Sequence, residues 1–214
     1  MYAQLNSQII YYERVGEGEK NILMLHGNGA SHDVFDVLSE AVKDRYTVYL
    51  PDTRGHGLSA TPKEYHYMDM AEDLNNLIGF LDIKQPDILG FSDGAIIAML
   101  CAIKYPQNCG TLYLCGGNMN PKGLTFKAAH EIKKAFRKDR NPLTELMLNE
   151  PNIPPDLLSR ISSKAFVFAG ENDMIKESET RKIASLIPDS ELHILPGEDH
   201  GSYVEHSSKL AEFI

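Results

Sequence analysis

The stretch Gly90-Phe91-Ser92-Asp93-Gly94-Ala95, GFSDGA, follows an apolar run that ends at Leu89 and precedes an apolar helical pattern over Ala95–Lys104. It is the only G-x-S-x-G in the chain. A serine in a tight turn between a strand and a helix is presented at the edge of a sheet, and the flanking glycines let strand and helix approach without a clash of Cβ atoms. The stretch therefore predicts a strand–turn–helix unit with Ser92 as a nucleophile.

Short apolar runs alternate with longer helical patterns on both sides of this unit. We predict strands at Ile9–Val15, Asn21–Leu25, Tyr46–Leu50, Asp87–Phe91, Thr111–Cys115, Ala165–Ala169 and Glu191–Leu195. The middle runs are apolar without interruption, as expected for strands buried on both faces. Helical spacing appears over His32–Asp44 and Tyr67–Leu81. The alternation predicts one α/β domain on a mostly parallel, doubly wound sheet of about seven or eight strands.

One segment, residues 118–164, interrupts the alternation because it contains no strand pattern. Ala128, Ile132 and Phe136 fall at helical spacing within it. We therefore expect a short helical lid over the carboxyl ends of the strands, with residues 1–117 and 165–214 forming the core. Residues 122–140 carry seven basic and two acidic side chains. A solvated helix face explains this charge, and a surface that attracts an anionic substrate is the alternative.

The overall charge and the terminal sequence limit the classes of partner and location. The 214 residues include 21 Lys and Arg against 30 Asp and Glu, a formal net charge of −9 that argues against a general affinity for nucleic acid. The amino terminus lacks the pattern of a signal peptide, and no apolar run is long enough to span a bilayer. The three cysteines lack a C-x-x-C spacing and are expected to be reduced packing residues. We therefore expect a cytoplasmic protein without a membrane span or a metal site.

A serine nucleophile needs a general base, and His200 is the best candidate among eight histidines. It lies in the loop Pro196–Gly201, which follows the last predicted strand and is expected to open a terminal helix. His193 falls inside that strand and His206 inside that helix. Both are therefore expected to be packing or surface residues, and His200 is left as the predicted base.

An acid that orients the base and donors for an oxyanion complete such a site. Asp173 follows the strand at Ala165–Ala169 and should reach the same sheet edge, where a helix cap is its other possible role. The N–H of Asp93 follows the nucleophile directly. The glycine-rich loop His26–Ala30 follows another strand, and its Asn28 N–H is the favoured second donor. The loop lacks the lysine of a phosphate-binding motif.

The Asp93 side chain is an awkward neighbour for Ser92, because a carboxylate opposes negative charge on a substrate oxygen. At a helix amino terminus a carboxylate gains about 0.3–1 kcal/mol from the macrodipole. Pointed at the oxyanion from ~6 Å, at an effective dielectric near ~20, it would oppose the transition state by roughly 3 kcal/mol. We therefore expect it to turn aside at the helix end without a role toward substrate. An inward carboxylate would require a cationic partner, such as an Arg, a Lys or a substrate ammonium.

Five motifs in this order resemble the α/β-hydrolase family. They are HGNGA at 26–30, DTRGHGLS at 52–59, GFSDG at 90–94, GENDM at 170–174 and EDHG at 198–201. The resemblance runs from about Ile9 to the carboxyl terminus and is interrupted only by the predicted lid. It implies the order nucleophile, acid, histidine, which Ser92, Asp173 and His200 reproduce. It also implies a structural role for the DTRGHGLS loop and, because the lid is short for the family, a shallow or open pocket.

The triad and the resemblance together predict a serine hydrolase that cleaves a small-molecule carboxylic ester or thioester through an acyl-enzyme, with no cofactor. Hydrolysis of C–C bonds and perhydrolysis on the same triad are the alternatives. A non-catalytic ligand-binding member is a third, against which the complete triad argues. Relatives with an aspartate nucleophile, the dehalogenases and epoxide hydrolases, are disfavoured by Ser92. A metallohydrolase is disfavoured because no H-x-H or H-E-x-x-H pattern appears.

Overall fold

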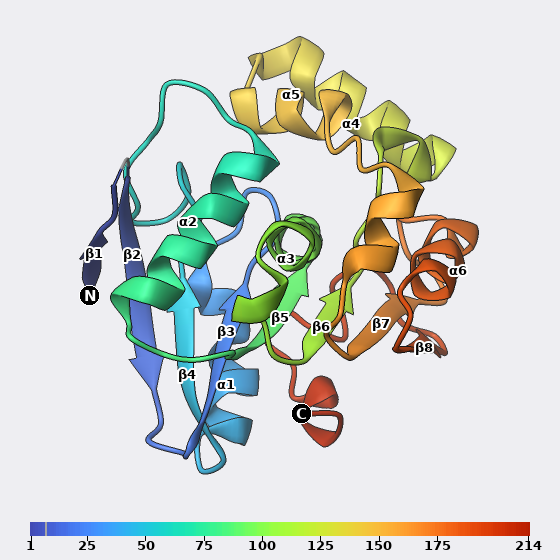
Figure 1. Ribbon diagram of the computed structural model, residues 1–214. Coiled ribbons are helices and arrows are strands. Elements are labelled where there is room, and N and C mark those ends of the chain that lie inside the picture. The colour runs from blue at the N-terminus through green and yellow to red at the C-terminus, as the bar shows by residue number, and fades with distance from the viewer. Residues whose placement is uncertain (7) are drawn as a thin grey trace.

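The computed structural model describes residues 1–6 and 8–214. The described residues form an eight-stranded sheet in the order β1-β2-β4-β3-β5-β6-β7-β8 (Figure 1). The strands are β1 (Tyr2–Gln4), β2 (Ile9–Val15), β3 (Lys20–Leu25), β4 (Tyr46–Pro51), β5 (Asp87–Phe91), β6 (Leu112–Cys115), β7 (Ala165–Gly170) and β8 (Ser190–Leu195). The pairs that involve β2 are antiparallel, and the pairs from β4 through β8 are parallel. The predicted mostly parallel sheet is confirmed.

Helices cover both faces of this sheet. They are α1 (Asp36–Val42) on one face and α2 (Tyr67–Phe80), α3 (Asp93–Lys104) and α6 (Glu177–Leu186) on the other. Alternate residues of a buried strand point to opposite faces. In β3, Leu23 packs with the core beneath α2 and α3, whereas Met24 packs with the core beneath α1. This alternation makes the sheet doubly wound.

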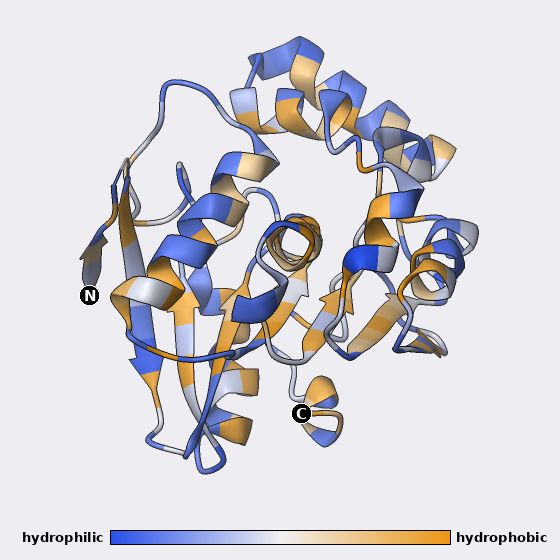
Figure 2. Cartoon of the chain, viewed as in Figure 1, coloured by the Kyte–Doolittle hydropathy of each residue, from blue (hydrophilic) through white to orange (hydrophobic). Residues whose placement is uncertain are grey.

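Helix α3 is the most deeply embedded of these helices. All its residues from 93 to 102 are buried, and Figure 2 colours the helix mainly orange at the centre of the molecule. It begins directly after β5 and packs against α2 and the central strands. The residue that precedes α3, Ser92, is therefore attached to a rigid support.

The structure differs from the predicted elements at both ends of the chain. The three-residue strand β1 is too short to be recognised by pattern, and it forms by pairing with β2. The expected terminal helix is absent from the described residues, which instead form turns and a short 3-10 helix over Lys209–Glu212. His206 has a left-handed backbone with φ 48° and donates its N–H to the Val34 carbonyl. This conformation ends the helical turn before it can propagate.

The 118–164 insertion lies above the carboxyl ends of the parallel strands (Figure 1). It contains α4 (Phe126–Asp139), α5 (Pro142–Asn149) and a 3-10 helix over Pro155–Arg160. The side chains of Thr125 and Asn141 accept hydrogen bonds from the first turns of α4 and α5, which fixes where both helices begin. The outer surface of the two helices is largely blue in Figure 2.

Candidate active site

Ser92 occupies the tight turn between β5 and α3. Its φ of 54° and ψ of −113° lie in a region that residues other than glycine rarely adopt, so the turn is strained. A Cβ at Gly90 would lie 2.3 Å from the Gly94 carbonyl oxygen, and a Cβ at Gly94 would lie 2.1 Å from that of Leu25. The two glycines thus allow the close approach that the motif predicts, and the Ser92 hydroxyl stands at the sheet edge.

A continuous chain of hydrogen bonds joins Ser92, His200 and Asp173. Nε2 of His200 lies 2.9 Å from Oγ of Ser92, and Nδ1 lies 2.6 Å from Oδ1 of Asp173. Because a carboxylate accepts hydrogen bonds, we assign the ring proton to Nδ1, which leaves Nε2 free to accept the serine proton. The structure thus brings together the three residues that were proposed from the sequence, although they lie far apart in the chain.

The Asp173 carboxylate is held in place by the backbone around it. The side chain is 2 % exposed. Its Oδ1 accepts the N–H of Ile175 at 2.9 Å, and Oδ2 accepts the N–H of Gly170 at 3.3 Å. Helix α6 begins only after Lys176, its N-cap residue, so the alternative of Asp173 as a helix cap is wrong. The carboxylate is instead aimed at His200.

The His200 ring is positioned by its own loop and by the end of β6. A Cβ at Gly116 would lie 2.7 Å from Cε1 of His200, so only glycine lets the ring pack against the backbone there. The Asp199 carboxylate accepts the N–H groups of Gly201 at 3.0 Å and Ser202 at 2.9 Å, which stabilises the loop. The ring is therefore oriented from two sides before any substrate binds.

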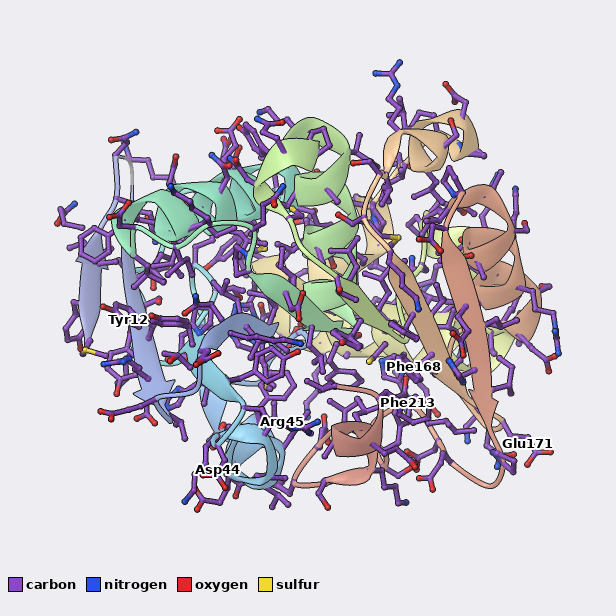
Figure 3. The ribbon with its side chains drawn as sticks, turned by 60° about the horizontal axis from the view of Figure 1, so that its bottom comes forward. Tyr12, Asp44, Arg45, Phe168, Glu171 and Phe213 are labelled. Carbon is purple, nitrogen blue, oxygen red and sulfur yellow. The ribbon has the colours of Figure 1, made fainter. Side chains whose placement is uncertain are left out.

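The two neighbouring histidines lie outside this chain of hydrogen bonds. The His193 ring packs against Phe168 and Phe213, with centroid distances of 4.9 and 4.8 Å. Figure 3 shows these two phenylalanines side by side. His206 is 59 % exposed and pairs with Asp36 at 2.8 Å. His193 is thus a packing residue and His206 a surface residue, as expected, although His206 lies in a turn and not in a helix.

The glycine-rich loop after β3 lies directly against the nucleophile. A Cβ at Gly27 would lie 3.1 Å from the Ser92 Cβ. His26 anchors this loop, because its Nδ1 hydrogen-bonds with the Gly27 carbonyl at 2.8 Å and its Nε2 accepts the N–H of Thr53 at 3.0 Å. Burial lowers the pKa of His26 to about 4, so the ring is neutral. Its Nε2 carries no proton and can accept the hydrogen bond from Thr53. The loop is thus fixed at its base.

Two backbone N–H groups close to Ser92 are candidate donors for an oxyanion. Asn28 follows Gly27 in the loop, and Asp93 begins α3. Within residues 1–6 and 8–214, neither N–H donates to a protein acceptor. Both are free to bind an oxygen that carries developing negative charge.

The loop at residues 52–59 braces the strands that carry the site. Nε of Arg54 donates to Oδ2 of Asp73 at 2.7 Å, and Nη2 donates to Oδ1 at 2.9 Å, so a buried two-point ion pair joins the loop to α2. The buried Asp52 carboxylate accepts the N–H groups of His32 and Leu58, each at 2.8 Å. These contacts support the structural role that the motif implies.

The Asp93 side chain is buried at the start of α3. The residue is 5 % exposed, and Nδ2 of Asn28 donates to its Oδ2 at 2.9 Å. Burial raises the pKa of the Asp93 carboxyl group, while hydrogen bonds from Asn28 and Tyr67 favour its charged form. The carboxylate thus lies at the amino-terminal end of α3, where the sequence places it, and it is hydrogen-bonded to protein groups there.

A cavity of about 10 Å³ lies beside Ser92. Its walls include the polar residues Tyr67, Asp93, Asn118 and Glu150 and the apolar residues Ile96, Leu124, Met147, Met174 and Ile175. Residues of the insertion supply a large part of this wall. The space beside Ser92 is therefore narrow and partly walled by the insertion.

The sequence analysis did not propose three polar residues of this wall, Tyr67, Asn118 and Glu150, of which Tyr67 and Glu150 are bonded to each other. Tyr67 begins α2, and Glu150 follows α5. The Glu150 carboxylate accepts the Tyr67 N–H at 3.1 Å and pairs with Nδ1 of His66 at 2.7 Å. No local motif marks either residue, because only the packing of the insertion against α2 brings Glu150 to the pocket.

Three further properties concern the described part of the chain. It contains no group of three or more His, Cys, Asp or Glu side chains arranged to hold a metal ion. It has no helix with both the length and the apolarity needed to cross a membrane. All three cysteines are free and buried, and Cys101 and Cys109 have sulfurs 3.8 Å apart.

A family model described as the alpha/beta hydrolase fold matches residues 20–141. The chain is an α/β-hydrolase. The serine hydrolase BPHL of Mus musculus is 26 % identical to it over 241 residues, which cover 98 % of this chain and 83 % of that protein. The human protein of the same name is 26 % identical over 97 % of this chain and 83 % of its own length.

Solved α/β-hydrolase structures superpose on nearly the whole chain. An esterase from Exiguobacterium antarcticum matches with a TM-score of 0.83 and 20 % identity, covering 100 % of this chain and 96 % of the esterase. A meta-cleavage product hydrolase from Pseudomonas fluorescens matches with a TM-score of 0.81 and 17 % identity, over 100 % and 94 % of the two chains. At these identities the likeness concerns the fold, and the hydrolase relatives support hydrolase activity on it.

Proposed function

We propose that this α/β-hydrolase cleaves small carboxylic esters or thioesters through an acyl-enzyme, with Ser92, His200 and Asp173 as its catalytic triad. The hydrogen-bonded chain from Ser92 Oγ through His200 to Asp173 is the observation that carries this proposal. A strained serine at a strand–helix turn, a base within 2.9 Å and an oriented acid are the parts that acyl transfer requires.

The geometry supports a two-stage reaction. Ser92 Oγ bonds to the carbonyl carbon while His200 Nε2 takes its proton, and the carbonyl oxygen becomes an oxyanion bound by the N–H groups of Asn28 and Asp93. The tetrahedral intermediate collapses as the C–O or C–S bond breaks, and His200 returns the proton to the leaving alcohol or thiol. Water then attacks the acyl-enzyme with His200 again as base, which releases the acid and regenerates Ser92. The Asp173 carboxylate stabilises the imidazolium at each stage.

The pocket supports a small acyl group that is neutral or positively charged. Its volume of about 10 Å³ is far below that of sites for drug-sized ligands, so a small acyl group fits best and the wall must move to admit it. Asp93 and Glu150 both line it, and no Arg or Lys belongs to its described wall. Carboxylates in the wall of a pocket repel an anionic acyl group and attract an ammonium group. The basic side chains of α4 do not line this wall, so they do not make the pocket suitable for an anion.

We also propose that the insertion, residues 118–164, acts as the lid of this pocket, with residues 1–117 and 165–214 as the core. Leu124, Met147 and Glu150 of the insertion contribute to the wall. Substrate must therefore pass or displace part of the insertion to reach Ser92, which makes the insertion the region where chain-length preference is decided.

A panel of p-nitrophenyl esters tests the reaction class. We expect turnover that is fastest on acetate and butyrate esters and falls for longer acyl chains, together with labelling of one serine by a fluorophosphonate. A vinylogous diketone, the substrate type of a C–C hydrolase, serves as the contrasting arm. Turnover of the diketone with none of the esters, or a wild-type protein that the fluorophosphonate leaves unlabelled, would overturn the proposal.

A further inference from the structure

The Asn28 carboxamide joins three segments that are distant in the chain. Its Nδ2 donates to the Asp93 carboxylate at 2.9 Å and to the Leu143 carbonyl oxygen at 3.1 Å. The glycine-rich loop is thereby tied to the start of α3 and to the first turn of α5. One amide group therefore connects the loop beside the nucleophile with the helix that follows Ser92 and with the insertion.

Asp93 is a firm anchor for this connection, whereas the loop has little packing of its own. Asp93 is buried at the start of the fully embedded part of α3. The loop contains Gly27 and Gly29, and Gly29 has φ 72° with no heavy atom within 4 Å of a Cβ position. Past the His26 anchor, the Asn28 side chain provides hydrogen bonds that attach this glycine-rich stretch to α3 and α5.

The two bonded residues are also the two whose N–H groups are the proposed oxyanion donors. Their side-chain hydrogen bond therefore sets the spacing between the backbone donors. An oxyanion hole stabilises the transition state only when its donors are fixed at the right distance before the reaction. A carboxylate directly behind the nucleophile has a use here, because it is an acceptor that a neighbouring loop can bind.

We propose that Asn28 is a positioning residue, whose carboxamide holds the two oxyanion donors in register through the Asp93 carboxylate and couples them to α5 through the Leu143 carbonyl. This inference rests on the proposed serine-hydrolase function. It assigns the Asn28 side chain a task separate from that of its N–H, and it makes the seating of the insertion a condition for a complete oxyanion hole.

The decisive variants are Asn28→Ala and the exchange Asn28→Asp/Asp93→Asn. Asn28→Ala keeps the N–H but removes both side-chain bonds. The exchange restores a bond between positions 28 and 93 with donor and acceptor reversed, but it leaves Leu143 without its donor. Ser31→Ala is the matched control, because it removes a side-chain hydrogen bond to Asp33 in the same loop outside this connection.

Steady-state kinetics on p-nitrophenyl acetate and inhibition by a boronic acid, which binds serine as a tetrahedral anion, provide the readout. For Asn28→Ala we expect kcat to fall about 30- to 100-fold and boronate affinity to fall by a similar factor, with KM within about threefold. The exchange should have a kcat about tenfold higher than that of Asn28→Ala. Its remaining difference from the wild type is attributed to the lost bond to Leu143 of α5. Ser31→Ala should stay within about twofold of the wild type in kcat.

A merely structural role gives a different pattern. In that case Asn28→Ala would lower the melting temperature but leave kcat and boronate affinity within about twofold of the wild type, which would overturn the proposal. An exchange variant as slow as Asn28→Ala would also overturn the role given to Asp93. Fluorophosphonate labelling of the wild type distinguishes failure of the proposed function from failure of the positioning role. An unlabelled wild type refutes the proposed function. A labelled wild type with an unaffected Asn28→Ala variant refutes the positioning role alone.

Discussion

The loops that carry the proposed triad and the insertion above them differ in how firmly the core holds them. Ser92 precedes ten buried residues of α3, and the Asp173 side chain is 2 % exposed. In α4, by contrast, the buried residues are Ala128 and Ile132, and Phe126 is 88 % exposed. The chemical groups thus stand on the rigid part of the fold, as preorganised catalysis requires. The pocket wall stands partly on a segment with fewer buried residues, which we expect to separate from the core at a lower cost in free energy.

The largest effect should come from removing the nucleophile on the rigid side. We expect Ser92→Ala to lower kcat on p-nitrophenyl acetate at least about 10⁴-fold and to abolish fluorophosphonate labelling, with an unchanged circular dichroism spectrum. His200→Ala should lose a similar factor. His193→Ala is the control: it should lower the unfolding free energy by about 1–3 kcal/mol through lost ring packing and keep kcat within about threefold. Labelling that persists in Ser92→Ala would refute the assignment.

The second largest effect should be a dependence of stability on pH that arises from His26, the buried residue at the base of the glycine-rich loop. Burial lowers its pKa to about 4 in the folded protein, whereas a free imidazole titrates near ~6.5. Between these values the unfolded state binds a proton that the folded state does not, so stability falls as the pH falls. We expect a loss of about 3 kcal/mol from pH 6.5 to 4, measured by urea unfolding.

A variant separates this contribution from that of the acidic residues. His26→Asn should flatten the decline of the unfolding free energy over the same pH range, whatever its stability at neutral pH. His206→Gln removes an exposed ring whose pKa is raised by Asp36, and it should leave the decline almost unchanged. Equal slopes for His26→Asn and the wild type would show that this ring is not held in a neutral form.

One pocket carboxylate, Asp93, belongs to the core and the other, Glu150, to the insertion. Replacing each in turn therefore compares the two regions. Asp93→Asn changes the core wall, and Glu150→Gln changes the insertion wall. Loss of either charge should lower kcat/KM for amine-bearing esters, such as alanine p-nitrobenzyl ester, about 10- to 100-fold. Neutral esters should stay within about tenfold, because Asp93→Asn retains the backbone N–H and an acceptor for Asn28. The larger loss is expected at the buried Asp93, where solvent screening is weaker.

An equal loss on charged and neutral esters in Asp93→Asn would assign that carboxylate to support of the site and remove it from substrate selection. A Glu150→Gln enzyme with unchanged selectivity would remove the insertion wall from that role.

The smallest effect should come from trimming the insertion wall. Met147→Ala enlarges the pocket on the insertion side, so we expect the ratio of kcat/KM for butyrate over acetate esters to rise about 3- to 10-fold. Met68→Ala, at an exposed methionine on α2, is the matched control and should leave that ratio unchanged. An unaltered ratio in Met147→Ala would place chain-length selection on the core side of the pocket.

The parts of the molecule that could be predicted from sequence are those specified by local pattern. Buried parallel strands such as β5 and β7 read as continuous apolar runs, and the glycines around Ser92 mark a turn whose geometry few other residues permit. The order of the motifs at Ser92, Asp173 and His200 sufficed to propose the three residues that the structure joins by hydrogen bonds.

The remaining features depend on partners that lie far away in the chain. The orientation of Asp93 is set by Asn28 and Tyr67, and the position of Glu150 in the pocket depends on how α5 meets α2. The expected terminal helix failed for a similar reason, because a long-range hydrogen bond from His206 stabilises a left-handed residue there. The local sequence pattern around a residue does not show which distant residues will contact it.

Because all three cysteines are buried, thiol reagents have no exposed native cysteine to modify on the described surface. A cysteine introduced at the exposed position Lys134 on α4 would be the single accessible thiol of the described surface. A fluorophore attached there would follow the insertion in real time, while hydrolysis of a chromogenic ester would report independently on the chemistry. The two regions of this hydrolase can thus be observed in one experiment without removing any native residue of the core.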